Sequence, residues 1–463
     1  MTGDRLPTPW GVVPITGMRR MIDGGTLKGP GPLAGCTLQP YWWERGNGQP
    51  SVPGEPAAAL PESVDAAVVG GGYSGLSAAL TLARAGRSVV VLDARAPGFG
   101  CSSRNGGLVG PSFHKLGYKG LTASVGDKAA RDILVESMEA LTFLKGFIAE
   151  EAIDCGFHPH GRFRGAARPR HYEELARQAD DLKAAVGLEF DMVPRGEQQN
   201  EIGSDLYHGG IVYHQDGHLH PVLYHRGLAE RAARAGARLF AGTPVSALRR
   251  EGEGFELAVA GRRILARQVL IATNGYTDKA FAYHRRRVIP LRSAMIATEP
   301  LGARRMKELS PRGRGFGDTS RLVLYYRPSP DGERMVFGGR AFDIDDRPDR
   351  YAPDLYRLMT RVFPQLQGVA LTHAWSGTVA YTFDHAPHIG QTDGVYFTMG
   401  YCGSGVGRAT YFGRKAALKM LGSREGRTSL DGLAFRTRPL YNGYPWFLPA
   451  LLRWHSWADR LGL

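Results

Sequence analysis

The chain has 463 residues, of which 43% are hydrophobic and 22% are charged, and its formal net charge at pH 7 is +14. This composition is that of a soluble globular protein, and the length predicts two or three domains or one large discontinuous domain. There is no run of about 18 apolar residues, which disfavours a transmembrane helix.

The four cysteines form no CxxC pair, so a disulfide scaffold or a cysteine-rich metal site is disfavoured, and we expect no metal. The arginines are scattered and no nucleic-acid-binding motif is present, so we expect no nucleic-acid partner. The first residues contain no apolar stretch typical of a secretory signal, which predicts a cytoplasmic protein without an integral membrane segment. The sequence leaves the oligomeric state open.

Residues 1–60 are rich in glycine and proline and show little periodicity, so we expect an irregular N-terminal arm. The arm contains the aromatic cluster YWWE at 41–44. Buried tryptophan and tyrosine side chains of this kind more often fasten a segment to the body of a protein than bind a ligand. We interpret the cluster as a clamp.

A βαβ unit follows the arm, and the GGGYSG sequence at 70–75 connects its first strand to its helix. In this G-x-G-x-x-G pattern Gly70 permits a tight turn, Gly72 lets backbone approach a pyrophosphate, and Gly75 lets helix and strand pack closely. Asp93 ends the second strand, where a carboxylate can accept the ribose hydroxyls. The motif predicts NAD or FAD, because an acid at this position would repel the 2′-phosphate of NADP.

Three further stretches favour FAD over NAD. The small and polar loop PGFGCSSRNGG at 97–107 suits a chain that passes beneath a pyrophosphate and a flat ring, and the apolar strand VLIATNG at 269–275 can lie alongside the nucleotide. A second glycine-rich loop heads a helix at 400–422. FAD is long enough to need both loops, and backbone amides of Gly403, Gly405 and Gly407 could approach the flavin edge, where the reduced ring is negative.

These stretches together resemble the D-amino acid oxidase-like superfamily of FAD-dependent oxidoreductases, and within it gamma-glutamylputrescine oxidase, glycine oxidase and sarcosine oxidase most. The likeness spans roughly residues 60–420 and also includes DGHLHP (216–221), AGTPVSAL (241–248), FGGR (337–340) and WSGTVAYTFDHAPHIG (375–390). It implies an α/β (α+β) fold with a Rossmann-like FAD-binding domain of the p-hydroxybenzoate hydroxylase type and a substrate domain built on an antiparallel sheet.

The expected domain organisation is discontinuous. We assign residues 61–150, 205–284 and 370–430 to the FAD-binding domain, 151–204 and 285–369 to the substrate domain, and 431–463 to a C-terminal aromatic helix that packs on the protein. The motifs and the resemblance together give the candidate cofactor-binding residues, in which Val245 contacts the adenine through its backbone. They are Gly70, Gly72, Tyr73, Ser74, Gly75, Asp93, Ala94, Arg95, Gly100, Cys101, Ser102, Ser103, Arg104, Asn105, Gly106, Gly107, Val245, Thr273, Asn274, Gly275, Gly403, Ser404, Gly405, Val406 and Gly407.

The resemblance implies oxidation of a primary or secondary amine or amino acid to an imine by hydride transfer to flavin N5, with O2 as the expected acceptor. Residues on strands that face the flavin are the substrate-pocket candidates: Tyr325, Arg327, Arg340 and Trp375. Arg327 could bind a substrate carboxylate. No arrangement of side chains that would serve as a catalytic base emerges from the spacing.

Two departures from the family pattern matter. Members similar to sarcosine oxidase attach FAD to a cysteine where this chain has Gly377, so we expect non-covalent FAD. Those members also use a lysine near the flavin for reaction with oxygen, and the strand RMVFGGR at 334–340 has none. Two alternatives therefore stay open: a dehydrogenase of the same fold that reduces a quinone or an electron carrier, and a flavin-binding interaction protein without turnover.

Overall fold

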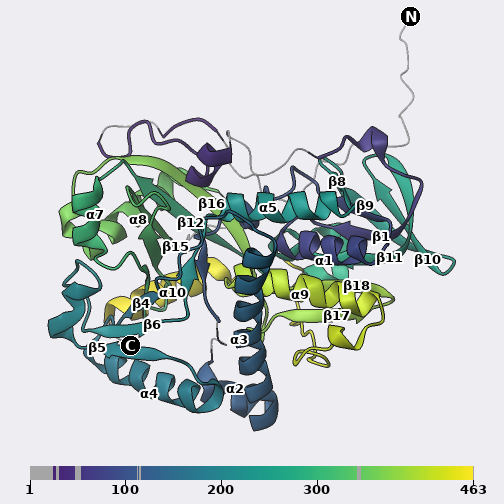
Figure 1. Cartoon of the computed structure of the whole chain (residues 1–463). Helices are drawn as coiled ribbons and strands as arrows, with labels where there is room; N and C mark the ends of the chain where they lie inside the picture. The colour runs from purple at the N-terminus through teal and green to yellow at the C-terminus, as the bar shows by residue number, and fades with distance from the viewer. Residues whose placement is uncertain are drawn as a thin grey trace, which may run out of the picture.

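The computed structural model describes residues 24–27, 31–46, 54–111, 113, 116–340 and 346–461. Two eight-stranded sheets form its two lobes, and helices cover them on the outside (Figure 1). The long helix α3 (Asp127–Glu150) stands between the lobes. Two short strands, β3 (Leu108–Val109) and β7 (Gly217–His218), pair with each other in a separate two-stranded sheet.

The first sheet is the nucleotide sheet that the βαβ pattern predicts. Its central strand β1 runs parallel to β2 on one side and to β11 on the other, and β8 and β18 extend the parallel part. Strands β9, β10 and β17 pair in antiparallel fashion with their neighbours. The bounds are β1 (Ser63–Val69), β2 (Val89–Leu92), β8 (Arg238–Phe240), β9 (Val245–Glu251), β10 (Gly254–Val259), β11 (Arg262–Ile271), β17 (His388–Thr392) and β18 (Val395–Met399).

The second sheet is antiparallel except where β13 runs parallel to β4. Its order is β16-β12-β15-β14-β13-β4-β6-β5. The bounds are β4 (Arg162–Gly165), β5 (Phe190–Val193), β6 (Gly210–Tyr213), β12 (Ile289–Thr298), β13 (Gly315–Asp318), β14 (Tyr325–Pro328), β15 (Met335–Arg340) and β16 (Leu371–Tyr381). Both the mixed α/β class and the antiparallel second sheet were predicted from the sequence.

Two strands from the segments assigned to the FAD-binding domain pair within the second sheet, and the domain boundaries remain a prediction. Strand β6 belongs to the expected FAD segment 205–284, and β16 belongs to the expected FAD segment 370–430, yet both pair within the second sheet. The alternation of apolar residues that identifies a strand is the same in either sheet, so the sequence pattern could not assign these two strands.

Helices cover the nucleotide sheet on one face only. Ala66 and Val68 of β1 pack against the helical layer, whereas Ala67 and Val69 pack on the opposite side with residues of β9 and β10. Other helices, among them α4 (Pro169–Val186) and α8 (Pro348–Val362), pack on the second sheet. The helices of the described chain are α1 (Tyr73–Arg84), α2 (Gly117–Val125), α3, α4, α5 (Pro221–Arg234), α6 (Ala282–Arg285), α7 (Ala303–Leu309), α8, α9 (Gly405–Met420) and α10 (Leu448–Leu461). Within the described residues, none of these helices is long and apolar enough to cross a bilayer.

Helices α1 and α9 cross at very close range because small residues lie at the contact. A Cβ on Gly413 of α9 would lie 2.3 Å from the carbonyl oxygen of Ser74, so only glycine fits there. One turn away, the Ser77 hydroxyl donates a hydrogen bond to the carbonyl of Thr410 at 2.7 Å. The crossing brings the two glycine-rich loops, which lie more than three hundred residues apart in the chain, to the same place in the fold.

The N-terminal arm fastens the two lobes to each other. Trp42 is completely buried, and its ring lies edge-on to that of Trp375 at 6.1 Å between centroids. The indole of Trp43 donates to the Ser103 hydroxyl at 3.0 Å, and the Tyr41 hydroxyl donates to Asp331 at 2.9 Å. The aromatic cluster therefore acts as the clamp that its composition predicted.

Candidate active site

A cavity of about 300 Å³ extends from the glycine turn of the first sheet to the inner face of the second sheet. Its nucleotide end is lined by Gly70, Asp93 and Thr273, which follow parallel strands of the first sheet, and by Thr243 and Val245 at the connection from β8 to β9. Its far end is lined by residues of the second sheet and of the loop that precedes α9. The cavity thus crosses the carboxyl ends of parallel strands, where open α/β sheets bind their ligands.

The turn between β1 and α1 has the shape that a pyrophosphate needs. Gly70 has φ +107°, and a Cβ there would lie 2.8 Å from the carbonyl oxygen of Ala272. A Cβ on Gly75 would lie 1.9 Å from the carbonyl oxygen of Gly70, so this glycine lets the helix start against the strand. The N-cap residue of α1 is Gly72, which brings no side chain over the helix N-terminus, where backbone dipoles favour an anion.

Asp93 is held in place by backbone amides on both sides. The amide of Gly71 donates to one carboxylate oxygen at 2.8 Å, and the amide of Arg95 donates to the other at 2.9 Å. Burial raises the pKa of Asp93 to about 6, although these two hydrogen bonds act in the opposite direction. The carboxylate is therefore fixed at the nucleotide end of the cavity, as a ribose-binding acid needs to be.

His225 of α5 also holds the glycine turn, although no sequence motif identifies it as a functional residue. Its ring is fully buried, and Nε2 donates to the carbonyl oxygen of Gly71 at 2.7 Å. Burial lowers the pKa of His225 to about 4, so the ring is neutral at pH 7. A Cβ on Gly98 would collide with this ring at 2.6 Å, which explains the glycine at that position.

The loop at 97–107 and the start of α1 form one hydrogen-bonded unit. The Tyr73 hydroxyl donates to the carbonyl of Ser102 at 2.6 Å, and the Tyr73 amide donates to the Ser102 hydroxyl at 3.1 Å. Asn105 donates from its side-chain amide to the carbonyls of Cys101 and Ser102, each at 3.0 Å, and accepts from the amide of Gly107 at 2.8 Å. This network fixes the floor of the cavity.

Arg104 acts within this floor instead of presenting a charge to a ligand. Its guanidinium donates to the carbonyls of Phe99 at 2.7 Å and Ser376 at 3.2 Å, and it lies 4.7 Å from the ring of Trp43. The Trp375 indole donates to the carbonyl of Arg104 at 2.9 Å. Arg104 thereby connects the loop, the arm and β16.

The second glycine-rich loop is tied to the end of β11. The amide of Gly400 donates to the side-chain oxygen of Asn274 at 2.9 Å. Three of the loop residues have positive φ: Gly400 at +83°, Cys402 at +54° and Gly403 at +86°. This tight turn brings the start of α9 to the cavity wall, where residues 401–406 line it.

Tyr325 and Arg340 lie at the far end of the cavity, on neighbouring strands. The Tyr325 hydroxyl contacts the Ser293 hydroxyl at 2.8 Å, and Ser293 also donates to the carbonyl of Gly339 at 3.1 Å. Burial raises the pKa of Tyr325 to about 12, so it stays protonated at neutral pH. The Arg340 guanidinium donates to the Tyr381 hydroxyl behind the wall.

Arg162 of β4 is a further cationic residue in the cavity lining that the sequence reasoning missed. Its Nε lies 2.9 Å from a carboxylate oxygen of Asp216, which is buried. Burial raises the pKa of Asp216, and the charges of Arg162 and Lys145 partly counter that effect. The pattern RFRG at 162–165 indicates a strand, but it does not show on which face of the sheet the Arg162 side chain lies or that this face borders the cavity.

Two of the four substrate-pocket candidates, Arg327 and Trp375, do not line the cavity. Arg327 lies two residues after Tyr325 and therefore on the same face of β14, but the arm covers it. Its guanidinium donates to His218 Nδ1 at 2.5 Å and to the carbonyl of Leu219 at 2.8 Å, and it lies 5.0 Å from the Trp42 ring. A substrate carboxylate therefore meets protein atoms at this position, and we do not assign Arg327 to substrate binding.

Most of the candidate cofactor residues line the cavity; Gly75, Ser103, Gly275 and Gly407 do not. Gly75 lies at the contact between α1 and β1, and Ser103 accepts the hydrogen bond from the arm. A Cβ on Gly275 would lie 2.9 Å from the carbonyl oxygen of Thr378. Gly407 faces α3, where its nearest neighbours are 3.7 Å away. These residues support the site from behind.

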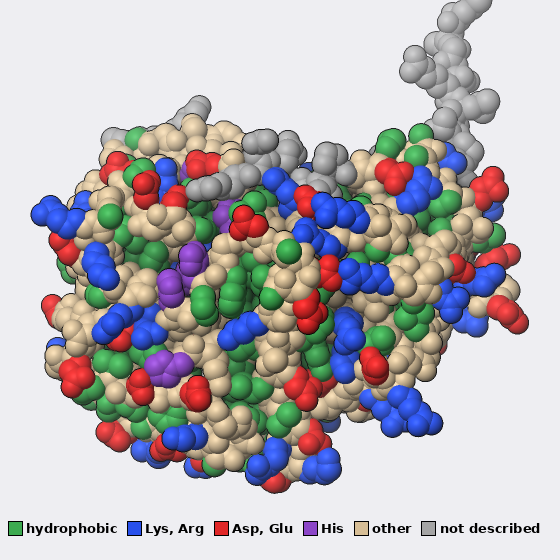
Figure 2. Space-filling view, viewed as in Figure 1, with side chains coloured by type: hydrophobic (Ala, Val, Ile, Leu, Met, Phe, Trp, Pro, Cys, Tyr) green, Lys and Arg blue, Asp and Glu red, His purple; other side chains and the backbone are tan. Residues whose placement is uncertain are grey.

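The charged surface shows no single basic patch on the face seen in Figure 2, where lysine and arginine side chains are interspersed with aspartate and glutamate. Within the described part of the chain, no three His, Cys, Asp or Glu side chains are grouped so as to bind a metal ion. The expectations of no nucleic-acid partner and no metal remain predictions.

The fold and the cavity are those of a dinucleotide-binding protein, in which the cavity reaches from a Rossmann-like sheet to an antiparallel sheet. The family profile of FAD-dependent oxidoreductases matches residues 65–418, and the chain belongs to this family. It is thus an FAD-dependent oxidoreductase, which confirms the resemblance, the class of enzyme and the cofactor inferred from the sequence.

Two relatives and one solved structure illustrate the similarity. The chain is 34% identical over 406 residues to a probable oxidoreductase, OrdL, of Rhizobium meliloti, with 86% of this chain and 92% of the relative covered. It is 30% identical over 374 residues to the gamma-glutamylputrescine oxidoreductase of Escherichia coli, with 80% and 87% covered. The crystal structure of glycine oxidase from Geobacillus kaustophilus superposes with a TM-score of 0.68 at 19% identity, covering 82% of this chain and 99% of that one.

Proposed function

We propose that this enzyme oxidises the C–N bond of a primary or secondary amine, and in particular of one that carries a carboxylate, to an imine. The observation that supports this proposal is the far end of the cavity, where Tyr325, Ser293 and the cationic side chain of Arg340 lie on adjacent strands. A guanidinium is well suited to bind a substrate carboxylate. The Escherichia coli relative, whose name includes gamma-glutamylputrescine, fits an amine of this class.

The residues at the nucleotide end fit the dinucleotide of FAD. Asp93 would accept the ribose hydroxyls, the N-terminus of α1 would face the pyrophosphate, and Val245 would contact the adenine through its backbone. The loops at 97–107 and 401–406 would hold the flavin end. When bound, FAD supplies the oxidant, which accepts a hydride from the substrate carbon at flavin N5.

Tyr325 would position the amine by accepting a hydrogen bond. Since Ser293 donates to the carbonyl of Gly339, its oxygen is available to accept the Tyr325 proton. The lone pairs of the Tyr325 oxygen can then receive an N–H of the substrate. With a pKa of about 12, Tyr325 does not act as a base near neutral pH.

Arg340 would fix the substrate carboxylate. Its hydrogen bond to the Tyr381 hydroxyl holds the guanidinium at the wall, and Gly403 leaves room beside it, since a Cβ there would lie 3.5 Å from both Arg340 Nη2 and the Tyr381 hydroxyl. Two anchors, one for the nitrogen and one for the carboxylate, would orient the reacting carbon, and such positioning supplies much of the rate of hydride transfer.

Among the described residues, no histidine or lysine lines the cavity. The amine would therefore lose its extra proton to water before it reacts. We expect kcat/KM to rise with pH until the pKa of the free amine is reached, so that two substrates with different amine pKa values give two different profiles. A single profile for both substrates would identify a titrating protein group instead.

O2 is the proposed electron acceptor, and a dehydrogenase that reduces a quinone or an electron carrier is the second candidate. The observation that favours the second candidate is the same lack of a lysine in the described cavity lining. A cytoplasmic location is also part of the proposal and is tested by cell fractionation. Membership of the family makes the chain an oxidoreductase, so the interaction protein without turnover is not retained.

FAD is proposed to bind without a covalent bond. Gly377 occupies the position at which similar enzymes have a cysteine, and a Cβ there would lie 3.3 Å from the Cβ of Arg104. The thiol of Cys101 lines the cavity, but burial raises its pKa to about 11, so the reactive thiolate is scarce. Acid precipitation should release all flavin into the supernatant; flavin that stays in the pellet would contradict this.

The decisive experiment is an anaerobic titration of the FAD-loaded enzyme with gamma-glutamylputrescine, sarcosine, glycine, proline and N-methylated amino acids, followed through the visible absorbance of the flavin. Bleaching by one amine and fast recovery in air would establish an oxidase. Bleaching that persists in air but reverses with a soluble quinone would establish the dehydrogenase. If no amine bleaches the flavin, amine oxidation is contradicted.

The role of Arg340 is tested by replacing it with methionine. Loss of a charge-assisted contact of roughly 1.5–3 kcal/mol should raise KM for a carboxylate-bearing amine about 10- to 100-fold. An amine without a carboxylate should be affected much less. The matched control is Arg312→Met, which makes the same change at an exposed position outside the cavity. Equal losses for both classes of amine would remove Arg340 from carboxylate binding.

A further inference from the structure

The C-terminal helix α10 has a broad apolar surface, and the protein body covers only part of it. Leu448, Leu452 and Ala458 are buried, at 6%, 7% and 1% exposure. Leu451, Trp454 and Trp457 follow each other at intervals of three residues around the adjoining side of the helix, with 40%, 54% and 50% of their surface exposed. The apolar residues of a surface helix normally face the core, but the described chain leaves this part of the apolar surface uncovered.

The segment that leads into α10 extends the exposed apolar surface. Leu440 is 92% exposed, Tyr444 42% and Trp446 63%. The rings of Trp454 and Trp457 lie 5.3 Å apart, and the ring of Trp446 contacts that of Phe447 at 5.7 Å. Monomeric soluble proteins rarely expose large apolar side chains in such a group without an interaction. We call residues 435–447, together with α10, the C-terminal strap.

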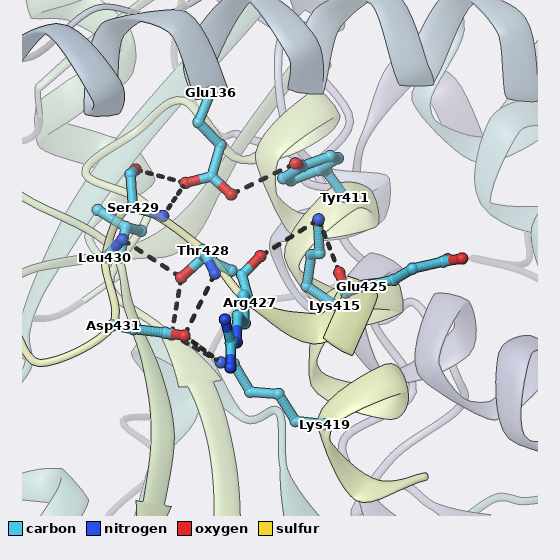
Figure 3. Close-up of polar contacts among 10 residues, drawn as sticks. All are labelled: Glu136, Tyr411, Lys415, Lys419, Glu425, Arg427, Thr428, Ser429, Leu430 and Asp431. Atoms are coloured by element: carbon cyan, nitrogen blue, oxygen red, sulfur yellow. Dashed lines mark hydrogen bonds and ion pairs between the residues drawn. The ribbon is translucent and has the colours of Figure 1, made fainter. Parts of the chain in front are cut away.

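The strap is firmly rooted, as Figure 3 shows for the residues just before it. Buried Glu136 of α3 accepts hydrogen bonds from the amide of Ser429 at 2.8 Å and from the Tyr411 hydroxyl at 3.3 Å. Lys419 of α9 forms an ion pair with Asp431 at 2.6 Å. The exposed residues that follow are therefore presented by a segment with a fixed starting point.

The strap then lies on the basic turn at 284–287. Arg287 donates to the carbonyl of Phe435 at 2.8 Å, and the Thr437 hydroxyl donates to the carbonyl of Arg286 at 2.5 Å. Tyr441 and Leu448 pack with Ile289 and Leu291 of β12. The strap is thus held along its length, which leaves its outward side chains in place on the surface.

The charge of the strap is strongly positive. Between residues 432 and 463 the sequence has four arginines and one acidic residue, Asp459. Arg436, Arg438 and Arg453 are exposed, and so is Arg286 on the turn beneath. Exposed tryptophans combined with arginines are typical of segments that bind the interface of a membrane, where an indole finds both apolar and polar surroundings.

We propose that the C-terminal strap binds the surface of a bilayer that contains anionic phospholipid. The tryptophan face would enter the boundary between headgroups and acyl chains, and the arginines would meet the lipid phosphates. Tyr381, which holds Arg340 at the cavity wall, packs against the same cluster as Tyr441 and Leu448. Bound in this way, the far end of the cavity would lie one layer of side chains from the strap.

The test is sedimentation of the full-length, FAD-loaded protein with vesicles. We expect it to pellet with vesicles of mixed phosphatidylglycerol and phosphatidylcholine, to bind pure phosphatidylcholine vesicles more weakly, and to be released in part by high salt. The double variant Trp454→Ser, Trp457→Ser should lose binding at least about tenfold. The matched control is Leu265→Ser, at a residue of β11 that is 46% exposed, and it should bind as the parent does.

Flavin content and absorbance show whether each variant is folded, so the comparison does not depend on activity. Failure of the parent protein to bind anionic vesicles overturns the proposal. So does equal binding by the double variant. If the protein does not bind vesicles but self-associates, and the double substitution abolishes that self-association, the partner of the strap is a second copy of the chain. This outcome would likewise overturn the proposal.

Discussion

Replacing Gly413 with alanine tests whether the close crossing of α1 and α9 holds the site together. The new Cβ would lie 2.3 Å from the carbonyl oxygen of Ser74 and 2.8 Å from its Cα, whereas ordinary contacts begin at 3.4 Å. Both neighbours are backbone atoms, so a side-chain rotation cannot relieve the overlap. The helices must part by about 1 Å, the difference between 2.3 and 3.4 Å.

The size of the effect follows from three contributions. Overpacking in a well-packed interior costs roughly 1–3 kcal/mol, and a rigid overlap with backbone belongs to the upper part of that range. A gap of up to about 1 Å also removes a quarter to a half of the dispersion energy of the atoms that separate. Alanine returns about 1 kcal/mol because it favours the helix over glycine. We expect a net loss of stability of about 2 kcal/mol.

The matched control is Gly146→Ala, which makes the same exchange inside α3. There the nearest atom to the new Cβ is a Glu150 side-chain oxygen at 3.8 Å. This variant should gain roughly 0.5–1 kcal/mol from helix propensity alone. The two substitutions should therefore have opposite signs.

Thermal midpoints of the FAD-loaded and FAD-free forms measure the sign of the change in stability. Dilution of the holoenzyme measures how fast FAD is lost. A protein of this size with a bound cofactor does not unfold in two states, so the comparison concerns direction and not absolute free energy. Gly413→Ala should melt lower and release FAD faster, because Ser74, Val406 and Ala409 line the cavity on the two helices that separate. If it melts as high as Gly146→Ala, the crossing does not have the tightness described.

Three more outcomes are expected. His225→Phe leaves the buried carbonyl of Gly71 without its donor, which costs roughly 1–3 kcal/mol; the Kd for FAD, measured by flavin fluorescence, should rise about tenfold or more, and an unchanged Kd would show that the turn holds without it. Asp93 has a folded pKa of about 6, above its ordinary value of 3.8, so its ionisation destabilises the FAD-free fold as pH rises from about 4 to 6. The melting midpoint of Asp93→Asn should therefore rise relative to that of the parent across that interval, and a constant difference between the two midpoints would contradict the raised pKa. Trp43→Phe keeps a ring but removes the hydrogen bond to Ser103, so the midpoint should fall by an amount equivalent to about 1 kcal/mol; no change would mean that water replaces the indole.

The sequence predicted the nucleotide half of the site well because its signals are local. The turn at 70–75, the acid at the end of β2 and the helix between them all lie within one short stretch, and each glycine has a steric reason that the pattern contains. The loop at 97–107 and the turn before α9 could be recognised for the same reason. In each case the residues that define the element are neighbours in the chain.

The rest of the site depends on contacts that no local pattern contains. His225 reaches Gly71 across 154 residues, and a histidine in an amphipathic helix looks the same whether or not it meets a carbonyl. Arg327 was expected in the substrate pocket because it alternates correctly with Tyr325, but Trp42 covers it from the N-terminal arm. Alternation along a strand predicts which side chains share a face of the sheet, but only the packed structure shows what covers that face.

The contacts of the arm also determine the order in which parts of the protein can fold during synthesis. Thr37 exchanges backbone hydrogen bonds with residues 372 and 374, and Tyr41 bonds to Asp331. The arm is synthesised at least 290 residues before these partners. Since Gly70 and Ala409 line the same cavity, the complete cofactor site exists only once residue 409 has been synthesised. The nascent chain must therefore keep its first βαβ unit folded, or protected, without the cofactor that this unit is shaped to hold.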